Sequence, residues 1–296
     1  MISNTENSLS LDLSQKLKAY AELLKIRLSL LVTFSGGMAY LLASHRVNLL
    51  DFTLFLLGGF MVTGSANIIN QIIEIDYDKL MKRTMGRPLP TGRLSISEAA
   101  VFSSILGVIG VAIHFIHFNL LTALLSFLSL ILYAFVYTPL KRVGPIAVFV
   151  GAFPGALPPM IGWVAVSNGI TTEALILFGI QFIWQFPHFW AIAWVAFEDY
   201  AKAGFKLLPS SNGRDLNTAF NIMIYTLFLI PISLLPMYIH LTGMTSAIIV
   251  TIAGVLFLMQ TFYLMKTCDT KAAKWMMFGS FLYLPIVQIA FVLDKI

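Results

Sequence analysis

Long apolar segments follow one another along almost the whole chain, and they constrain its fold more than any other feature. Each has about 20 residues and few charges, which is the length that a helix needs to span the roughly 30 Å hydrocarbon core of a bilayer. We identify nine of them, at 24–44, 52–75, 97–118, 120–138, 146–166, 173–197, 218–239, 246–265 and 275–293. Only 11% of the 296 residues are charged, against about 25% in a soluble domain. We therefore predict an all-α integral membrane protein, a bundle of about nine transmembrane helices.

Positive charge falls on alternate loops, and this pattern predicts the orientation. Seventeen of the 19 Lys and Arg residues lie in the N-terminal segment or in the loops after the second, fourth, sixth and eighth apolar segments. Loops rich in Lys and Arg stay in the cytoplasm, or in the matrix of an organelle. We expect residues 1–23 to form a cytoplasmic N-terminal tail and residues 24–296 to form a single membrane domain. The tail resembles neither a cleaved signal peptide nor an Arg-rich transit peptide, which favours the inner (plasma) membrane of a bacterium.

The most highly charged stretch, residues 67–93, begins inside the second apolar segment and reads NIINQIIEIDYDKLMKRTMGRPLPTGR. Asn70, Glu74 and Asp78 are spaced four residues apart, so a helix places their oxygen atoms on one face. Such oxygens suit Mg²⁺, which proteins hold through one or two carboxylates together with substrate phosphates. The stretch therefore predicts a magnesium site at the cytoplasmic face.

Basic residues follow these acids within the same stretch. The planar guanidinium groups of Arg83 and Arg87 suit a phosphate, because one guanidinium can bind two phosphate oxygens at once. A loop whose charges only fix the orientation would account for Lys79 and Lys82. It would not account for the polar residues inside the membrane segment, where unpaired polar groups are costly and are usually functional. We therefore expect a diphosphate beside the magnesium ion.

The order of these groups resembles the first signature of the UbiA family of intramembrane prenyltransferases, whose general form is N-x-x-x-D-x-x-x-D. Glu74 stands where the family form has Asp, so its side chain is longer by one methylene. The run from Asp78 to Pro88, D-x-x-M-x-R-T-x-x-R-P, is similar to the branch of the family that acts on haem. Three later stretches resemble family signatures in the same order: YTPLKR at 137–142, GAFPGALPPMIGWVA at 151–165 and WQFPHFW at 184–190. The resemblance implies a UbiA-type bundle.

The later signatures imply further site residues. Lys141 and Arg142 are implied to bind the diphosphate, although their charges would equally serve to fix the orientation. His188 is implied to act on the second substrate, through contact with iron or through proton transfer, and its other interpretation is a packing histidine. Many family members carry a second D-x-x-x-D motif, but here Asp199 is followed by Ala203. Asp199 is therefore a candidate metal ligand in an incomplete motif, and the number of magnesium ions stays open.

The resemblance also implies a reaction. The farnesyl group of farnesyl diphosphate would pass to a vinyl group of haem b, with addition of water, to give haem O and diphosphate on the route to the haem A of terminal oxidases. Mg²⁺ is the expected cofactor, whereas haem b is a substrate. The expected partners are the two substrates, the bilayer and a haem A synthase, with no nucleic acid. The implied catalytic residues are Asn70, Glu74, Asp78 and His188, and the implied lining of the haem and prenyl site is Trp184, Phe186 and Trp190.

Other functions compete with this one. A UbiA-type enzyme that acts on a quinone or another aromatic acceptor would share the diphosphate site, but the residues around Arg83 and His188 favour the haem branch. A transporter would spread polar residues through the depth of several segments, whereas here the charges gather at one face. An assembly subunit without activity would leave Asn70, Glu74 and His188 unexplained.

Overall fold

Nine helices of the described chain are long and apolar enough to cross a membrane, which confirms the predicted architecture. The computed structural model describes residues 12–296, so residues 1–11 of the predicted tail lie outside the described residues. The spans are α2 (Ile26–Ala43), α3 (Leu49–Ile73), α5 (Ile96–His117), Leu120–Leu140, α8 (Ile146–Ser167), α9 (Thr172–Val195), Leu216–Tyr238, α13 (Met244–Thr267) and α14 (Thr270–Leu293). Each predicted segment falls on one of these spans, with ends that differ by a few residues.

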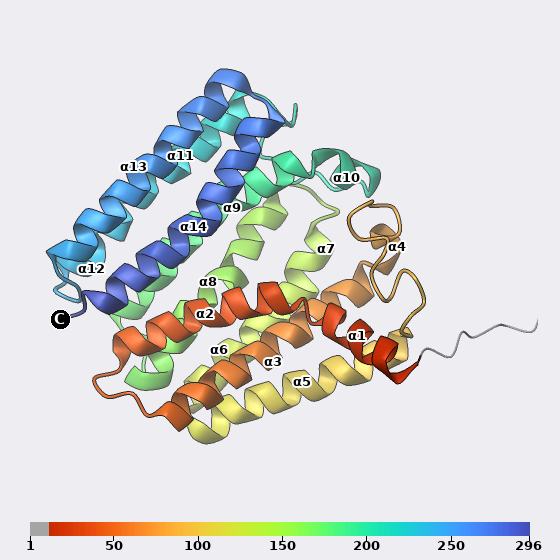
Figure 1. Ribbon diagram of the computed structural model, residues 1–296, viewed down its shortest axis with the longest axis horizontal. Coiled ribbons are helices and arrows are strands. Elements are labelled where there is room, and N and C mark those ends of the chain that lie inside the picture. The colour runs from red at the N-terminus through yellow and green to blue at the C-terminus, as the bar shows by residue number, and fades with distance from the viewer. Residues whose placement is uncertain (1–11) are drawn as a thin grey trace, which may run out of the picture.

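Shorter elements complete the chain. Leu120–Leu140 consists of α6 (Leu120–Ile131), a π-helical turn (Leu132–Tyr137) and α7 (Thr138–Leu140), while Leu216–Tyr238 consists of α11 (Leu216–Ser233) and α12 (Leu235–Tyr238). Three short helices, α1 (Leu13–Leu23), α4 (Ile75–Asp78) and α10 (Phe197–Lys202), lie at one end of the bundle (Figure 1). This is the end that carries the basic loops.

Helix α1 extends the folded unit toward the N-terminus. Its Ala19 and Leu23 are fully buried, in a cluster that includes Ile68 of α3 and Ala99 of α5. The folded unit therefore begins before the boundary that we predict at residue 24. The sequence does not indicate that α1 belongs to the folded unit, because several of its residues are polar and only one face of the helix is apolar.

The long helices pack around α8 and α9. Helix α8 contacts α2, α6 and α9, while α9 also contacts α11 and α14. The first and last spans, α2 and α14, lie side by side, so the order of the helices closes on itself (Figure 1). Gly162 lets α2 approach α8, because a Cβ atom at this position would clash with the carbonyl oxygen of Gly36.

Helix α8 runs unbroken through three prolines, Pro154, Pro158 and Pro159. The sequence favours a broken or kinked helix here, because a proline removes one backbone hydrogen bond and frees the carbonyl four residues before it. Gln181 of α9 donates to the freed carbonyl of Gly155 at 2.7 Å, and Ser129 of α6 donates to that of Pro154 at 3.4 Å. The helix is not broken, and neighbouring helices supply donors to two of the three freed carbonyls.

A π-helical turn at Leu132–Tyr137 lies just before Pro139 and positions Thr138 at the site. The N–H of Thr138 donates to the carbonyl of Tyr133, and the Thr138 hydroxyl donates to the same carbonyl at 2.9 Å. Single turns of this kind inside α-helices often occur at functional sites. Here the turn places the Thr138 side chain against Asn70 of α3.

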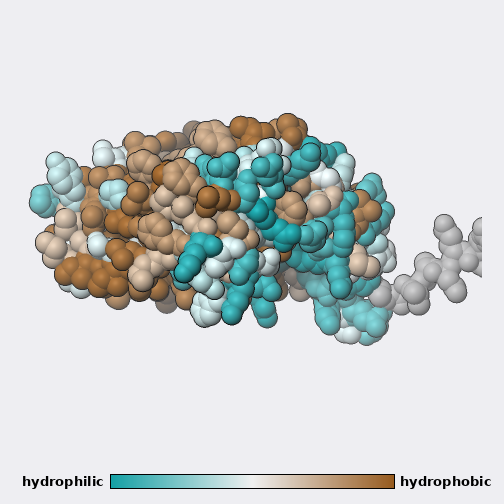
Figure 2. Space-filling view, turned by 90° about the horizontal axis from the view of Figure 1, so that it is seen from above, coloured by the Kyte–Doolittle hydropathy of each residue, from teal (hydrophilic) through white to brown (hydrophobic). Residues whose placement is uncertain are grey.

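Large apolar side chains cover the outside of the bundle. Val108 and Ile116 of α5 are 70% and 71% exposed, and Leu282 of α14 is 65% exposed. Figure 2 shows hydrophilic residues gathered at the end of the molecule that carries α1, α4 and α10, whereas hydrophobic residues cover most of the remaining face. Lipid is the environment that such a surface requires. The chain is a multi-pass membrane protein.

Candidate active site

Helix α3 ends at Ile73, and Glu74, with a φ of −96° and a ψ of 8°, separates it from α4, which begins at Ile75. The N–H of Glu74 donates to the carbonyl of Asn70 at 3.0 Å, and the N–H of Asp78 donates to the carbonyl of Glu74 at 2.8 Å. Asn70, Glu74 and Asp78 therefore lie on one face, as their spacing predicts. None of these three residues is more than 4% exposed.

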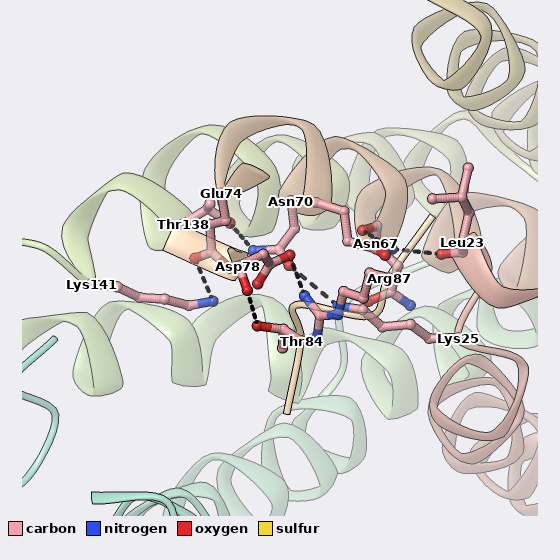
Figure 3. Close-up of polar contacts among 11 residues, drawn as sticks. Leu23, Lys25, Asn67, Asn70, Glu74, Asp78, Thr84, Arg87, Thr138 and Lys141 are labelled. Carbon is pink, nitrogen blue, oxygen red and sulfur yellow. Dashed lines mark hydrogen bonds and ion pairs between the residues drawn. The ribbon is translucent and has the colours of Figure 1, made fainter. Parts of the chain in front are cut away.

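Two basic side chains reach these acids from different elements (Figure 3). Lys141, which follows α7, places Nζ 2.8 Å from Glu74 Oε1. Arg87, in the loop between α4 and α5, places a guanidinium nitrogen 2.7 Å from Asp78 Oδ2. Burial lowers the pKa of Lys141, but the Glu74 carboxylate outweighs this effect and the net shift is upward. Each acid is thus paired with a partly buried cation.

A third cation, Lys25, enters the cluster from the junction of α1 and α2. Its Nζ donates to Asn70 Oδ1 at 3.3 Å, and Asn70 Nδ2 donates to Thr138 Oγ1 at 3.0 Å. Lys25 has a φ of 47°, a left-handed conformation that is strained for a side chain with a Cβ atom. Burial and then the charges of Arg87 and Lys141 lower the pKa of Lys25 well below its ordinary value. Sequence analysis missed this role, because the contact joins residues 45 positions apart.

The oxygen atoms on this face fit a divalent cation. Asp78 Oδ1 is buried without a hydrogen-bond partner, and Glu74 Oε1 has only the ion pair with Lys141. Buried carboxylate oxygens without partners are costly, and Mg²⁺ prefers such ligands. Within residues 12–296, no group of three or more His, Cys, Asp or Glu side chains could hold a metal ion. A magnesium ion would therefore depend on two carboxylates, the Asn70 amide and substrate phosphates, and its binding here stays a prediction.

Three predicted site residues lie at the rim of this cluster. Asp199 of α10 accepts hydrogen bonds from the backbone N–H groups of Lys82 and Arg83, at 3.3 and 3.0 Å. The Arg83 guanidinium lies 5.9 Å from the ring centroid of Tyr200, and Arg142 donates to the last carbonyl of α3 at 3.4 Å. Among the described residues, neither arginine forms an ion pair with a carboxylate. No carboxylate of the described chain therefore balances these two charges, and both guanidinium groups can bind an anionic ligand.

The predicted lining residues of α9 fall on two sides of that helix. His188 Nδ1 lies 2.9 Å from Ser280 Oγ, and its ring stacks on Trp184 with centroids 4.3 Å apart. Trp184 Nε1 also donates to the Ser280 carbonyl, so both side chains face α14. Phe186 and Trp190 instead pack against an aromatic ring of α11, at centroid distances of 4.4 and 5.1 Å. The four residues are not gathered on one wall.

Aromatic contacts connect the acid cluster to α9. Lys141 Nζ lies 4.7 Å from the ring centroid of Tyr137, whose ring lies 6.5 Å from that of Phe189. The ring of Phe189 lies 5.5 Å from that of His188. His188 is therefore two aromatic rings away from the buried ion pair. Sequence analysis did not single out Phe189, because a phenylalanine in an apolar helix carries no signal of its own.

Three polar side chains that the sequence did not single out form a hydrogen-bonded cluster inside the bundle. Ser35 of α2 donates to Gln181 Oε1 at 2.5 Å, and Gln288 Nε2 of α14 lies 2.6 Å from Ser35 Oγ and 3.0 Å from Gln181 Oε1. The three residues border a small pocket. They are uncharged and far apart in the sequence, so no pattern joined them. The distribution of polar residues by itself therefore does not separate an enzyme from a transporter.

Almost the whole membrane domain matches a known family. The model of the UbiA prenyltransferase family matches residues 29–283. A protein named protoheme IX farnesyltransferase from Cytophaga hutchinsonii is 55% identical over 285 residues, which cover 96% of this chain and 100% of the relative. A protein of the same name from Flavobacterium psychrophilum is 45% identical over 284 residues, which cover 93% of this chain and 94% of the relative.

The fold also matches solved structures that are distant in sequence. The structure of a digeranylgeranylglyceryl phosphate synthase superposes with a TM-score of 0.79 at 23% identity, over 95% of this chain and 98% of that one. A UbiA homologue from Archaeoglobus fulgidus, bound to DMAPP and Mg²⁺, superposes with a TM-score of 0.65 at 16% identity, over 94% of this chain and 98% of that one. These likenesses confirm the predicted arrangement of the helices.

Proposed function

Because this chain belongs to the UbiA prenyltransferase family, we propose that it transfers the farnesyl group of farnesyl diphosphate to a vinyl group of haem b. Water adds to the vinyl carbon, and the products are haem O and diphosphate. The relatives named protoheme IX farnesyltransferase, which match nearly the whole chain at 55% and 45% identity, support this choice of substrates.

One observation carries the proposal at the level of the site. Two buried carboxylates and three cations, Lys25, Arg87 and Lys141, meet at one end of a membrane helix. Asp78 keeps a buried oxygen without a partner, although Arg87 binds its other oxygen. A donor set that combines basic side chains with a free carboxylate oxygen suits a diphosphate together with a divalent cation.

The departing diphosphate sets the main chemical demand, because negative charge develops on it as the farnesyl–oxygen bond breaks. Mg²⁺, when held by Asn70, Glu74 and Asp78, would neutralise that charge. Arg87 and Lys141 hold the two carboxylates in place, and each has further N–H donors for phosphate oxygens. Donors that are fixed in advance are usually the largest catalytic contribution, and one of them typically contributes a factor of about 10² to 10³ in kcat.

The farnesyl cation requires a site from which water is excluded until the vinyl group attacks. Aromatic faces tolerate a nearby positive charge. Tyr137 and Phe189 lie between the Lys141–Glu74 ion pair and His188, so we assign them to this part of the site. Trp184 extends the same side toward α14. Phe186 and Trp190, which pack against α11, are assigned to the wall along the prenyl chain.

The hydrogen bonds around His188 indicate which of its ring nitrogens carries a proton. Ser280 Oγ donates to the carbonyl of Met277 at 2.6 Å, which uses its single hydrogen. The 2.9 Å contact between His188 Nδ1 and Ser280 Oγ then requires the proton on Nδ1, so in the neutral form of the ring the lone pair lies on Nε2. We assign to Nε2 either contact with the haem iron or acceptance of the proton that water addition releases. The haem absorption spectrum separates these roles, because only iron contact changes the ligand field.

The positions of the charges support a location and an orientation. We assign the protein to the inner (plasma) membrane of a bacterium, with α1 and the acid cluster facing the cytoplasm, because 17 of the 19 Lys and Arg residues lie at this end. Farnesyl diphosphate would enter from the same side, since its head group is too strongly charged to cross a bilayer. The product haem O would pass to a haem A synthase, the partner that the next oxidation of this product requires.

The test is a reconstituted reaction in bilayer nanodiscs with farnesyl diphosphate and haem b, in which haems are separated by chromatography and identified by mass. We expect haem O with Mg²⁺, and a loss of about 10²-fold or more in Asp78→Asn. Asp76→Asn is the matched control, because Asp76 is exposed and pairs only with Lys79. Wild-type rates in Asp78→Asn would refute the site. A wild type that prenylates a quinone precursor but not haem b would refute the acceptor.

A further inference from the structure

Two loops that are far apart in the sequence contact each other beside the acid cluster. The loop after α4, residues 79–94, meets α10 and the turn that follows it. Asp199 Oδ2 accepts a hydrogen bond from the N–H of Arg83 at 3.0 Å, and Asp199 Oδ1 accepts one from the N–H of Lys82 at 3.3 Å. Lys202 also lies 3.3 Å from Oδ1. Both oxygens of this carboxylate are therefore already used by the protein.

Aromatic side chains extend this contact toward Arg142, which lies in the loop after α7. Tyr77 of α4 stacks on Phe205, with ring centroids 5.3 Å and planes 28° apart. The guanidinium of Arg142 lies 4.4 Å from the Tyr77 centroid, and that of Arg83 lies 5.9 Å from the Tyr200 centroid. The contact thus joins the three segments that carry the predicted rim residues of the site.

We propose that Asp199 is a positioning residue, which fixes the backbone at Lys82 and Arg83 and thereby places the phosphate-binding arginines. Asp199 is not assigned to a second metal ion, because its oxygens have partners whereas Asp78 Oδ1 has none. The absence of an acid at position 203 agrees with this assignment. The consequence for substrate binding rests on the proposed function, whereas the backbone contact does not.

The loop is held from two sides just before Arg87. Thr84 Oγ1 donates to the carbonyl of Asp78 at 2.9 Å, which ties the loop to α4. Asp199 ties the two preceding residues to α10. Loss of Asp199 would release these two residues from α10, so the guanidinium of Arg83 would lose a constraint on its position. The Thr84 hydrogen bond and the Arg87–Asp78 ion pair would still hold the loop to α4. Farnesyl diphosphate would then bind less tightly, while the metal ligands on α3 and α4 would be unchanged.

The first experiment measures hydrogen exchange of residues 80–86 by mass spectrometry, on the full chain in nanodiscs without substrate or metal. We expect about tenfold faster exchange in Asp199→Ala, because hydrogen bonds to a charged group contribute a factor of this order. Asp199→Asn should exchange at an intermediate rate, since its amide keeps only one of the two oxygens that accept from the two backbone N–H groups. Glu198→Gln is the control, because the neighbouring Glu198 pairs with Arg214 instead. Exchange in α13, away from the contact, reports any general unfolding.

The second experiment measures the kinetics of the same variants. We expect the KM for farnesyl diphosphate to rise about tenfold in Asp199→Ala, with a smaller rise in Asp199→Asn and an unchanged Mg²⁺ concentration for half-maximal rate in both variants. A higher Mg²⁺ requirement in both variants would identify a metal ligand and overturn the proposal. Unchanged exchange in Asp199→Ala would overturn it as well. Because exchange needs no turnover, this result stands even if the wild type transfers no farnesyl group.

Discussion

Removal of the Lys141 charge is the perturbation whose effect follows most directly from the structure. Lys141 Nζ lies 2.8 Å from Glu74 Oε1, and the two side chains are only 12% and 5% exposed. Loss of one partner of a buried ion pair typically costs about 3–5 kcal/mol, because the remaining charge is left without compensation. Lys25 and Arg87 lie in the same cluster, so we expect the lower end, about 3 kcal/mol of unfolding free energy, for Lys141→Met.

Two further measurements separate the charge from the side-chain volume. The double variant Lys141→Met/Glu74→Gln removes both charges, and we expect it to recover most of the lost stability. Mg²⁺ should stabilise Lys141→Met more than it stabilises the wild type, because a bound cation would take the place of the ammonium group beside Glu74.

The assay follows the fluorescence of the five tryptophans during denaturant titration in detergent micelles. Lys271→Met is the control, because Lys271 is exposed and forms no ion pair among the described residues. A loss in Lys141→Met no larger than that in Lys271→Met would refute the reasoning. Failure of the double variant to recover stability would refute it too.

Three further predictions follow from the structure. Burial, and then the charges of Arg87 and Lys141, lower the pKa of Lys25, so the wild type should gain unfolding free energy as the pH rises from that lowered value toward the ordinary lysine range. Lys25→Met should lose this dependence and be at least as stable at pH 7, and a wild type whose stability does not change over this range would contradict the burial of the amine. Gly162→Ala should destabilise the protein by about 1–3 kcal/mol, because its Cβ atom would meet the backbone of Gly36. Gly59→Ala, whose nearest neighbour lies at 3.9 Å, should be neutral or gain about 0.5–1 kcal/mol; equal losses in denaturant titrations would speak against the close approach of α2 and α8. Partial burial raises the pKa of Asp199, but hydrogen bonds from the N–H groups of Arg83 and Lys82 outweigh this and hold the pKa below its usual value. The stability from this carboxylate should therefore be present above the usual carboxyl range and decline as the pH falls through the lowered value. Asp199→Asn should lack that decline, and an identical acid dependence in both proteins would argue against the contact.

The number and position of the spans were predictable, because hydropathy over about 20 residues reports directly on the cost of placing a segment in lipid. The course of α8 was not predictable in the same way. Its three prolines favour a break, whereas donors on α6 and α9 satisfy two of the carbonyls that the prolines free. The π-helical turn at Leu132–Tyr137 also depends on its surroundings, since its six residues carry no distinctive pattern.

The common face of Asn70, Glu74 and Asp78 was predictable, because helical spacing is a local property and two i→i+4 hydrogen bonds preserve it across the junction of α3 and α4. The partners of these residues were only partly predictable. Lys141 and Arg87 were expected near a diphosphate, but their pairing with Glu74 and Asp78 depends on how α7 and the loop after α4 fold back. Lys25 depends on a strained turn that no sequence rule indicates for a lysine.

The central claim is that this chain farnesylates haem at the Asn70–Glu74–Asp78 face. The most direct measurement expresses the chain in a bacterial host that lacks its own haem-farnesylating enzyme, extracts the haems from the membranes, and identifies them by chromatography and mass. We expect haem with a hydroxyethylfarnesyl group in cells with the wild type and only haem b in cells with an equal amount of Asp78→Ala in the membrane. Only haem b in cells with folded wild type, or the farnesylated haem at equal levels in both, would contradict this claim.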